Sequence, residues 1–249
     1  MAQFSNAHKS HEHSQGVLNL LREHDTFIES ISSVADMGAG GCLDIQWWSE
    51  LTTRDEQAEA LNLKCYAVDR APLQIDFDLP KNITYIQRDF EKRAIPTEVD
   101  VIWSHDSFQY VTNPLGTLKL WNQQMNTNGL LYIGIPLLSY KHLNQGIVTG
   151  RNFEFFNHTP LSMIYMLAVN GFDCRDAYIR KQKDDPWFHV AVFKSDVEPL
   201  DPSKTSWYDL ADKGLIHDSI INSFRKFGQV RQQDLLYTWL DKNLYRIEE

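Results

Sequence analysis

Three shortages in the sequence limit the kind of protein it encodes. The 249 residues include only three cysteines, Cys42, Cys65 and Cys174, which form no CxxC pair and no even disulfide set, so we expect a reducing compartment. No apolar run is long enough to cross a bilayer, and the N-terminal stretch MAQFSNAHKSHEHSQG lacks the apolar core of a signal peptide. We therefore expect a cytoplasmic protein that does not act at a membrane.

Basic residues are scarce as well. With 24 Lys and Arg against 33 Asp and Glu, the formal charge is -9, which opposes extended contact with a phosphate backbone. There is no basic stripe and no motif of the NPPY kind, and Asn113-Pro114 is predicted to open a helix instead. Nucleic acid is therefore not expected as a partner. Three N-terminal histidines, His8, His11 and His13, have a spacing that fixes no coordination geometry, so no metal site is expected.

The chain does contain an alternation of short apolar runs and amphipathic segments. A hydrophobic fraction of 43% is enough for one full core. The apolar runs predict buried strands over residues 33–37, 64–69, 83–87, 99–104 and 130–136. Helices are predicted between them, for example over residues 43–51 and 114–126, and Asn128-Gly129 is expected to stop the second one. This alternation predicts an α/β fold with a parallel sheet and helices on both faces.

Both ends of the chain are predicted to form helical extensions. An amphipathic helix over residues 14–31 has one apolar face, formed by Val17, Leu20, Leu21, His24, Ile28 and Ile31. We expect residues 1–31 to form a tail and a lid helix, residues 32–196 the ligand-binding domain, and residues 197–249 a helical extension packed on that domain. A dimer contact or a cover over the substrate is the alternative role for the C-terminal extension.

The stretch VADMGAGGCL, residues 34–43, places glycines directly after the first predicted strand. Ligands of open α/β sheets bind at the carboxyl ends of the strands, where glycine lets the backbone approach a ligand closely. A dinucleotide-binding loop would need a third glycine at position 43, which is leucine, and an acidic residue about 20 positions on, whereas Asp69 comes later. Asp36 also places a negative charge where a pyrophosphate would bind. A carboxylate there suits a ligand with a cationic end.

The spacing Asp36-x-Gly38-x-Gly40 resembles the first motif of the class I, Rossmann-like S-adenosylmethionine-dependent methyltransferases. Further matches follow in the order of that family: YAVDR, IQRDFEK and the long segment VDVIWSHDSFQYVTNPLGTLKLWNQQMNTNGLLYIGIP. The segments FFNHTPLSMIYMLAVNGFDCRDAYIRKQ and WFHVAVFKS resemble the closing helix and antiparallel hairpin of the fold. The resemblance covers residues 33–195 and implies a mostly parallel Rossmann-like sheet with a C-terminal antiparallel hairpin.

This resemblance implies S-adenosylmethionine as the cofactor and S-adenosylhomocysteine as its product. The loop with Gly38 and Gly40 would lie under the amino acid end of the cofactor, and Asp36 would orient the loop and help to hold the ammonium group. The alternative for Asp36 is a buried cap for the amides of the turn. Cys42 departs from the family pattern, because many relatives have glycine or another small residue at that position.

Other cofactor contacts are implied at the ends of the following strands. Asp69 would accept hydrogen bonds from both ribose hydroxyls, and its alternative is a solvated strand end. Asp89 and Phe90 would bracket the adenine, although acidic residues are common in loops. Arg70, which follows the first of these acids, and Ser104, near the end of the fourth strand, complete the set of cofactor-binding candidates.

Methyl transfer needs a nucleophile held in line with the sulfonium methyl group and protected from water. If the acceptor is a hydroxyl, His105 after the fourth strand could take its proton, with Asp106 as an orienting neighbour. His105 could instead only pack against the methionine part of the cofactor. His158 and Tyr140 are expected on loops at the same rim, but His158 could equally lie beside the cap of the helix that begins near Thr159.

We therefore expect an enzyme that moves a methyl group from S-adenosylmethionine to an oxygen or nitrogen of a small molecule or sugar, acting as a monomer or homodimer. One alternative is a module that binds this cofactor without catalysis. A less favoured alternative is an NAD-dependent oxidoreductase. The acceptor itself is not predicted, because variable loops and the two extensions build its pocket.

Overall fold

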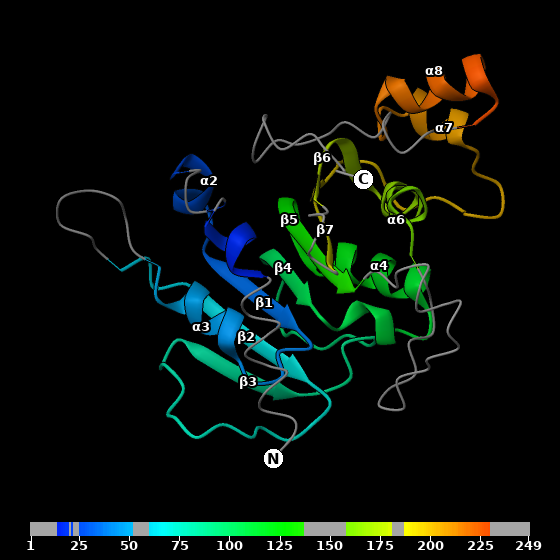
Figure 1. The fold of residues 1–249 in the computed structure, drawn as a ribbon. Coiled ribbons are helices and arrows are strands. Elements are labelled where there is room, and N and C mark those ends of the chain that lie inside the picture. Colours follow the sequence, from blue (N-terminus) through cyan, green and yellow to red (C-terminus); the bar gives the residue numbers. More distant parts are fainter. Residues whose placement is uncertain are drawn as a thin grey trace.

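The computed structural model describes residues 14–19, 21, 25–51, 60–136, 158–180 and 187–229 (Figure 1). One sheet contains seven strands: β1 (Ser33–Met37), β2 (Lys64–Asp69), β3 (Ile83–Gln87), β4 (Val99–His105), β5 (Met125–Pro136), β6 (Phe172–Arg180) and β7 (Trp187–Lys194). Their order is β3-β2-β1-β4-β5-β7-β6. The first five in this order are parallel, and β7 is antiparallel to both β5 and β6. The predicted sheet with its C-terminal antiparallel hairpin is confirmed.

Helices cover both faces of the sheet, as predicted (Figure 1). On one face, α3 (Leu43–Ser49) and the helical residues 14–19 and 21 share an apolar core with the sheet. The other face is covered by α4 (Pro114–Gln123), α6 (Pro160–Val169), α7 (Trp207–Asp212) and α8 (Asp218–Phe227). A further helix, α2 (Asp25–Ser30), precedes β1. In the part of the chain that the structure describes, no helix is long and apolar enough to span a membrane.

The parallel strands have nearly the bounds that the apolar runs predict. β1, β2 and β3 match the predicted ranges, and β4 extends one residue further, to His105. Because successive side chains of a strand point to opposite faces, Val34 and Asp36 of β1 face the core under α3, whereas Ala35 and Met37 face the core under α4. This alternation decides on which face each site residue lies.

The predicted boundary between the second helix and the fifth strand is wrong. Asn113 opens α4 as expected, since its side chain accepts a hydrogen bond from the Gly116 amide at 3.1 Å. However, α4 ends at Gln123, and Asn128 and Gly129 lie inside β5 rather than at a helix stop. Asn128 has a φ of 60°, and the register between β4 and β5 shifts there. The turn signal therefore marks an irregularity of a strand, because pairing with β4 outweighs the local helix preference.

The N-terminal helical residues bury the apolar face that their periodicity predicts. Val17, Leu21, Ile28 and Ile31 are buried, together with Leu18, which the predicted face does not include. Leu20 and His24 of that face lie outside the described residues.

The C-terminal helices pack on the sheet domain through a continuous apolar cluster. Leu210, Ile216 and Ile220 belong to the same core as α4 and α6. The backbone of this segment also touches β6, where the Cys174 amide donates to the Leu215 carbonyl at 2.8 Å. Residues 230–249, the rest of the predicted C-terminal extension, lie outside the described residues.

All three cysteines are buried free thiols. Burial raises the pKa of Cys42 and of Cys65 to about 12, and the negative charge of Asp36 adds to the effect in both. Burial also raises the pKa of Cys174 well above its ordinary value.

Candidate active site

The glycine loop after β1 is packed so closely that Gly38 has no room for a side chain. Its φ is +91°, and a Cβ built there would lie 2.3 Å from the Cβ of Ser107. Ser107 in turn donates a hydrogen bond to the Met37 carbonyl at 2.5 Å, so the loop after β4 is tied to the end of β1. Ser104 joins this contact through its hydroxyl, 2.7 Å from that of Ser107. The predicted candidates Gly38 and Ser104 are thus brought together.

Gly40 differs from Gly38 because the space beside it is open. A Cβ at Gly40 would find its nearest neighbour 4.0 Å away, so a ligand can approach the backbone here. The loop ends at Cys42, which has a φ of 60° and caps α3 without a side-chain hydrogen bond. A left-handed φ suits glycine better than a residue with a side chain, so the backbone of Cys42 is strained.

Asp36 is buried on the face of the sheet that α3 covers, with 3% of its surface exposed. Burial raises its pKa well above the ordinary 3.8, and the charges of Asp44 and Asp69 raise it further, while a hydrogen bond from the Ile45 amide lowers it. This bond to the Ile45 amide is the kind of contact expected if Asp36 instead serves as a buried cap for the amides of the turn. A cation beside this carboxyl group would favour its ionised form.

Asp44 is a buried acid in the first turn of α3 that the sequence reasoning missed. It accepts hydrogen bonds from the Ser14 hydroxyl and from Trp103 Nε1, both at 2.7 Å. The N-terminal helical residues are therefore tied to the helix that follows the glycine loop. An acidic residue in the first turn of that helix was the signal that could have identified it.

Asp69 lies at the end of β2 and faces the glycine loop. One carboxylate oxygen accepts a hydrogen bond from the Gly40 amide at 2.9 Å, and the other accepts one from the Ala71 amide at 2.8 Å. This carboxylate therefore fixes the backbone of the loop and is half-buried. The sequence prediction placed Asp69 at this edge but did not foresee its bond to Gly40.

The ends of β2 and β3 are linked by Arg70. Its guanidinium lies 3.2 Å from Asp89 and 2.6 Å from Glu91, and 5.4 Å from the ring centre of buried Phe90. Glu91, which the sequence reasoning missed, also accepts hydrogen bonds from the amide and hydroxyl of Thr112. The loop of Asp89 and Phe90, which is expected to contact the adenine, is therefore held by Arg70 on one side and by Thr112 on the other.

His105 is buried at the end of β4 and hydrogen-bonded to a neighbouring strand. Its Nδ1 lies 3.0 Å from the hydroxyl of Tyr132, which lies 2.8 Å from Nδ1 of His189. Asp106, its predicted orienting neighbour, has a φ of 55° and accepts a hydrogen bond from Gln109 at 2.5 Å. The sequence did not identify Tyr132 and His189, because a polar residue within an apolar strand does not reveal which residue of another strand it will contact.

His158 lies directly before Thr159, the N-cap residue of α6. Thr159 forms a capping box with Ser162, so His158 has the position beside a cap that was the alternative to catalysis. The centroid of its ring lies 5.6 Å from that of the Phe108 ring. Burial lowers the pKa of His158 from 6.5 to about 4. A general base works best with a pKa near the working pH, so this shift argues against His158 as the base. Tyr140 lies outside the described residues.

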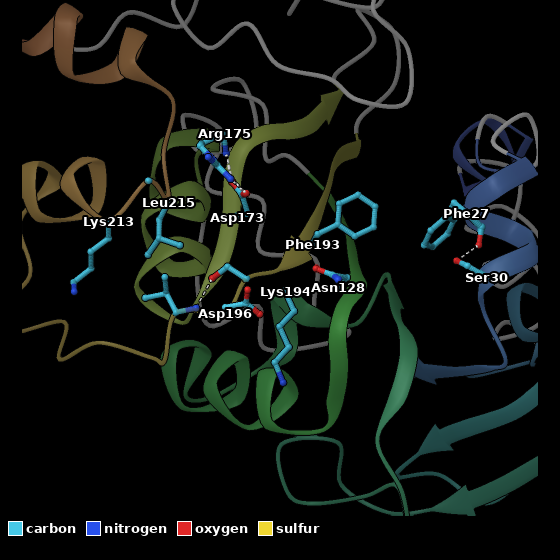
Figure 2. Close-up of a pocket in the computed structure, with 13 residues that line it drawn as sticks. Phe27, Ser30, Asn128, Asp173, Arg175, Phe193, Lys194, Asp196, Lys213 and Leu215 are labelled. Carbon is cyan, nitrogen blue, oxygen red and sulfur yellow. Dashed lines mark hydrogen bonds and ion pairs between the residues drawn. The ribbon is translucent and has the colours of Figure 1, made fainter.

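A groove of about 630 Å³ lies elsewhere on the molecule (Figure 2). It is lined by residues that include Phe27, Asn128, Arg175, Phe193, Lys194 and Lys213. These residues lie near the amino ends of the parallel strands, opposite the glycine loop, and none of the predicted site residues that the structure describes lines the groove. Within the described ranges, no group of three or more His, Cys, Asp or Glu side chains is placed to hold a metal ion.

Comparison with known proteins agrees with the fold. Residues 35–133, from β1 to β5, match a family model described as "Methyltransferase domain". No curated protein sequence matches the chain significantly.

Solved structures share the fold at low sequence identity. One is a chain of the complex between the Haloferax volcanii Trm112 methyltransferase activator and a putative methyltransferase, with a TM-score of 0.54, 11% identity, and coverage of 79% of this chain and 98% of that one. A putative sarcosine dimethylglycine methyltransferase from Galdieria sulphuraria has a TM-score of 0.54 and 13% identity, with 74% and 86% covered. The magnesium protoporphyrin IX methyltransferase from Synechocystis, solved with bound SAH, has a TM-score of 0.50 and 12% identity, with 74% and 83% covered.

Proposed function

Since the chain is a class I S-adenosylmethionine-dependent methyltransferase, we propose that it methylates an oxygen or nitrogen atom of a small molecule, for example a sugar or another metabolite. Its cofactor is S-adenosylmethionine. The identity of the acceptor atom and the class of acceptor are the proposed part of this function.

The residues at the carboxyl edge of the sheet fit a cofactor with a cationic end and no phosphate. Asp36 would balance the charge at the amino acid end, beside the loop of Gly38 and Gly40, where an open space faces the backbone. The contact of Asp69 is the observation that supports the proposal most. Its carboxylate already accepts the Gly40 amide at 2.9 Å, so it joins the loop to the position proposed for the ribose.

The remaining cofactor contacts are proposed at the ends of β3 and β4. Asp89 and Phe90 would bracket the adenine, and Arg70 holds Asp89 in place through its ion pair. Ser104 lies on the other side, under the loop.

Bound S-adenosylmethionine would supply a methyl group that is electrophilic because it is attached to a sulfonium. The chain's own residues then have to exclude water and hold the acceptor. His105 is the proposed base for the proton of a hydroxyl or amine, with Asp106 next to it and His158 as the weaker candidate. The lowered pKa of His158 leaves it neutral at physiological pH.

Two observations support a small acceptor. The net charge of -9 disfavours nucleic acid. In addition, the Ser14 hydroxyl is bonded to Asp44, whose charge acts on Asp36, so the N-terminal helical residues lie beside the proposed cofactor site. We propose that the segment of residues 1–31 serves as a lid there, which would limit the size of the acceptor.

The proposal is tested by following S-adenosylhomocysteine by mass spectrometry when the purified protein is incubated with S-adenosylmethionine and metabolite fractions. We expect product with a small hydroxyl or amine compound. Product only with RNA, DNA or protein would overturn the proposed acceptor class.

Asp69→Asn tests the cofactor site of the same protein. This change removes the charge but preserves the shape, and we expect it to weaken S-adenosylhomocysteine binding by roughly ten-fold or more, measured by titration calorimetry. Asp78→Asn, an exposed residue between β2 and β3, is the matched control and should bind like the wild type. Equal affinity of Asp69→Asn and the wild type would remove Asp69 from the site.

A further inference from the structure

Three buried polar side chains lie in a row across β4, β5 and β7. His105, Tyr132 and His189 expose 8%, 0% and 1% of their surfaces. Strand register brings them together, because His105 and His189 both pair with Gly134 of β5, and Tyr132 lies two residues earlier on the same face. The Tyr132 hydroxyl therefore lies between the two imidazoles, 3.0 Å from His105 Nδ1 and 2.8 Å from His189 Nδ1.

The surrounding residues are fitted to this row. A Cβ at Gly134 would lie 2.3 Å from His105 Nδ1 and 2.6 Å from the Tyr132 hydroxyl, so only glycine leaves room for the hydrogen bond. The Trp103 ring stacks on the Tyr132 ring with centroids 3.6 Å apart and an interplanar angle of 16°. The phenol is therefore fixed in position by the strand below it and the ring beside it.

The hydrogens available within the row constrain the two histidines. A phenol hydroxyl has one hydrogen and can donate it to only one of the two Nδ1 atoms. The other Nδ1 must carry a hydrogen and donate to the phenol oxygen. At least one of the two imidazoles is therefore held with its proton on Nδ1, which leaves its Nε2 as the basic nitrogen when the ring is neutral.

We propose that His105 is held with its proton on Nδ1, and that Tyr132 and His189 are positioning residues that fix this tautomer and accept charge from it. We choose His105 rather than His189 as the base because of where each lies in the fold. His105 ends a parallel strand at the edge of the glycine loop, one residue after Ser104, whereas His189 lies in the antiparallel strand β7. This inference rests on the proposed function, because a base is needed only if the acceptor loses a proton.

The row of His105, Tyr132 and His189 can take up the proton that the acceptor loses during methyl transfer. The acceptor oxygen or nitrogen forms its bond to the methyl carbon as the carbon–sulfur bond breaks with its electron pair on sulfur, and the acceptor proton moves to Nε2 of His105. The Nδ1 proton of His105 can then pass to the Tyr132 oxygen while the Tyr132 proton passes to Nδ1 of His189. The positive charge ends on His189, away from the glycine loop, until the proton returns to solvent.

Acidic residues from three elements lie next to a member of this row or to Trp103, which stacks on Tyr132. Asp106 follows His105 in the chain, and Asp44 of α3 accepts the Trp103 Nε1 hydrogen at 2.7 Å. Asp36 of β1 pairs in register with Trp103. Any measured titration of His105 therefore has to be compared with the titration of these three acids.

Imidazole nitrogen spectra of the full chain, labelled with 15N-histidine, test the tautomer without any turnover. Spectra would be recorded with and without S-adenosylhomocysteine over a range of pH, and His105→Gln and His189→Gln would assign the signals. We expect His105 to show a protonated Nδ1, and Tyr132→Phe to abolish this preference and uncouple the two titrations. A protonated Nε2 on neutral His105 in the wild type would overturn the proposal.

Kinetics separate a positioning role from a purely structural one. With an acceptor identified by S-adenosylhomocysteine formation, Tyr132→Phe should lower kcat by about 10- to 100-fold and change its pH profile, without weakening S-adenosylhomocysteine binding. Tyr165→Phe is the matched control, since its hydroxyl lies 2.7 Å from the Thr205 carbonyl and 3.1 Å from that of Pro202, and its ring packs against the core on the other face of the sheet. An unchanged kcat and pH profile in Tyr132→Phe would overturn the relay.

A failure of the proposed function has a different signature. If the wild type formed S-adenosylhomocysteine with no hydroxyl or amine acceptor, the acceptor chemistry would be wrong, whereas the tautomer and the coupling of the two histidines would still be read directly from the spectra.

Discussion

The carboxyl group of Asp36 occupies a position that is unfavourable for folding and that the proposed function uses for binding. It is buried next to Asp44 and Asp69, and burial and both neighbouring charges raise its pKa. Active sites often hold groups whose environment becomes favourable only when the ligand is present. Asp36 fits this description, because a bound cation would offset the two neighbouring charges.

Asp36→Asn is expected to stabilise the cofactor-free protein and to weaken cofactor binding. Because the folded-state pKa is raised, the folded protein binds a proton that the unfolded chain has lost, so stability falls as pH rises from about 4 through the raised pKa. The melting temperature of the wild type should fall over this range, and that of Asp36→Asn should depend less on pH and be higher at alkaline pH. Asp78→Asn is the exposed control. A lower melting temperature of Asp36→Asn at alkaline pH would contradict this interpretation.

His158 should contribute an opposite pH dependence. Burial lowers its pKa from 6.5 to about 4, so the unfolded chain takes up a proton between these values while the folded protein does not. Stability from this residue is complete above pH 6.5 and is lost as pH falls towards about 4. Urea unfolding of the wild type and of His158→Gln should show a smaller loss at acidic pH in the variant. Gln74→Asn, a change at an exposed residue without a titratable group, should keep the wild-type pH dependence.

Among the elements, the loops after β2 and β3 and the start of α4 are joined through one carboxylate. Glu91 binds Arg70 at 2.6 Å and accepts the amide and hydroxyl of Thr112, just before Asn113 caps α4. Its side chain is 11% exposed, so these contacts are little screened by water. The position of Phe90 therefore depends on a contact that lies outside the proposed adenine site.

Glu91→Gln tests this connection. Loss of the charged contacts should lower stability by about 1–3 kcal/mol and weaken S-adenosylhomocysteine binding a few-fold, because Arg70 would no longer be held beside Asp89. Thermal unfolding and calorimetry measure the two effects. Lys204→Gln, which breaks an exposed ion pair with Asp201, should change neither quantity. Wild-type affinity in Glu91→Gln would show that Arg70 does not depend on Glu91.

The sequence predicts the strands better than the boundaries of the helices. The bounds of β1 and β2 follow directly from apolar runs, because these strands are buried and a run of that composition favours burial inside a parallel sheet. The bounds of β3 also match, although this strand lies at the edge of the sheet and is partly exposed. The end of α4 could not be predicted, since Asn128-Gly129 is a turn signal whose meaning depends on pairing. Only the register with β4 shows that these residues interrupt a strand.

At the scale of the whole molecule, the sheet separates two apolar cores, and the proposed site residues and their neighbours come from both. Trp103 and Tyr132 lie in the core under α3, whereas Phe90 lies in the core with α4 and the C-terminal helices. Local motifs predicted candidate residues at the ends of single strands, such as Asp69 and His105. They could not predict His189, which is 57 residues from Tyr132 and reaches it only through antiparallel pairing in β7.

The three buried thiols make the wild-type chain suitable for site-specific labelling. With a pKa of about 12, Cys42 and Cys65 are ionised to about one part in 10⁵ at neutral pH, and only the thiolate reacts with maleimides. Cys174 is fully buried. Lys119 of α4 is exposed and therefore offers a position for a single reactive cysteine, introduced as Lys119→Cys. A fluorophore there would report on the folded enzyme without removal of any native cysteine.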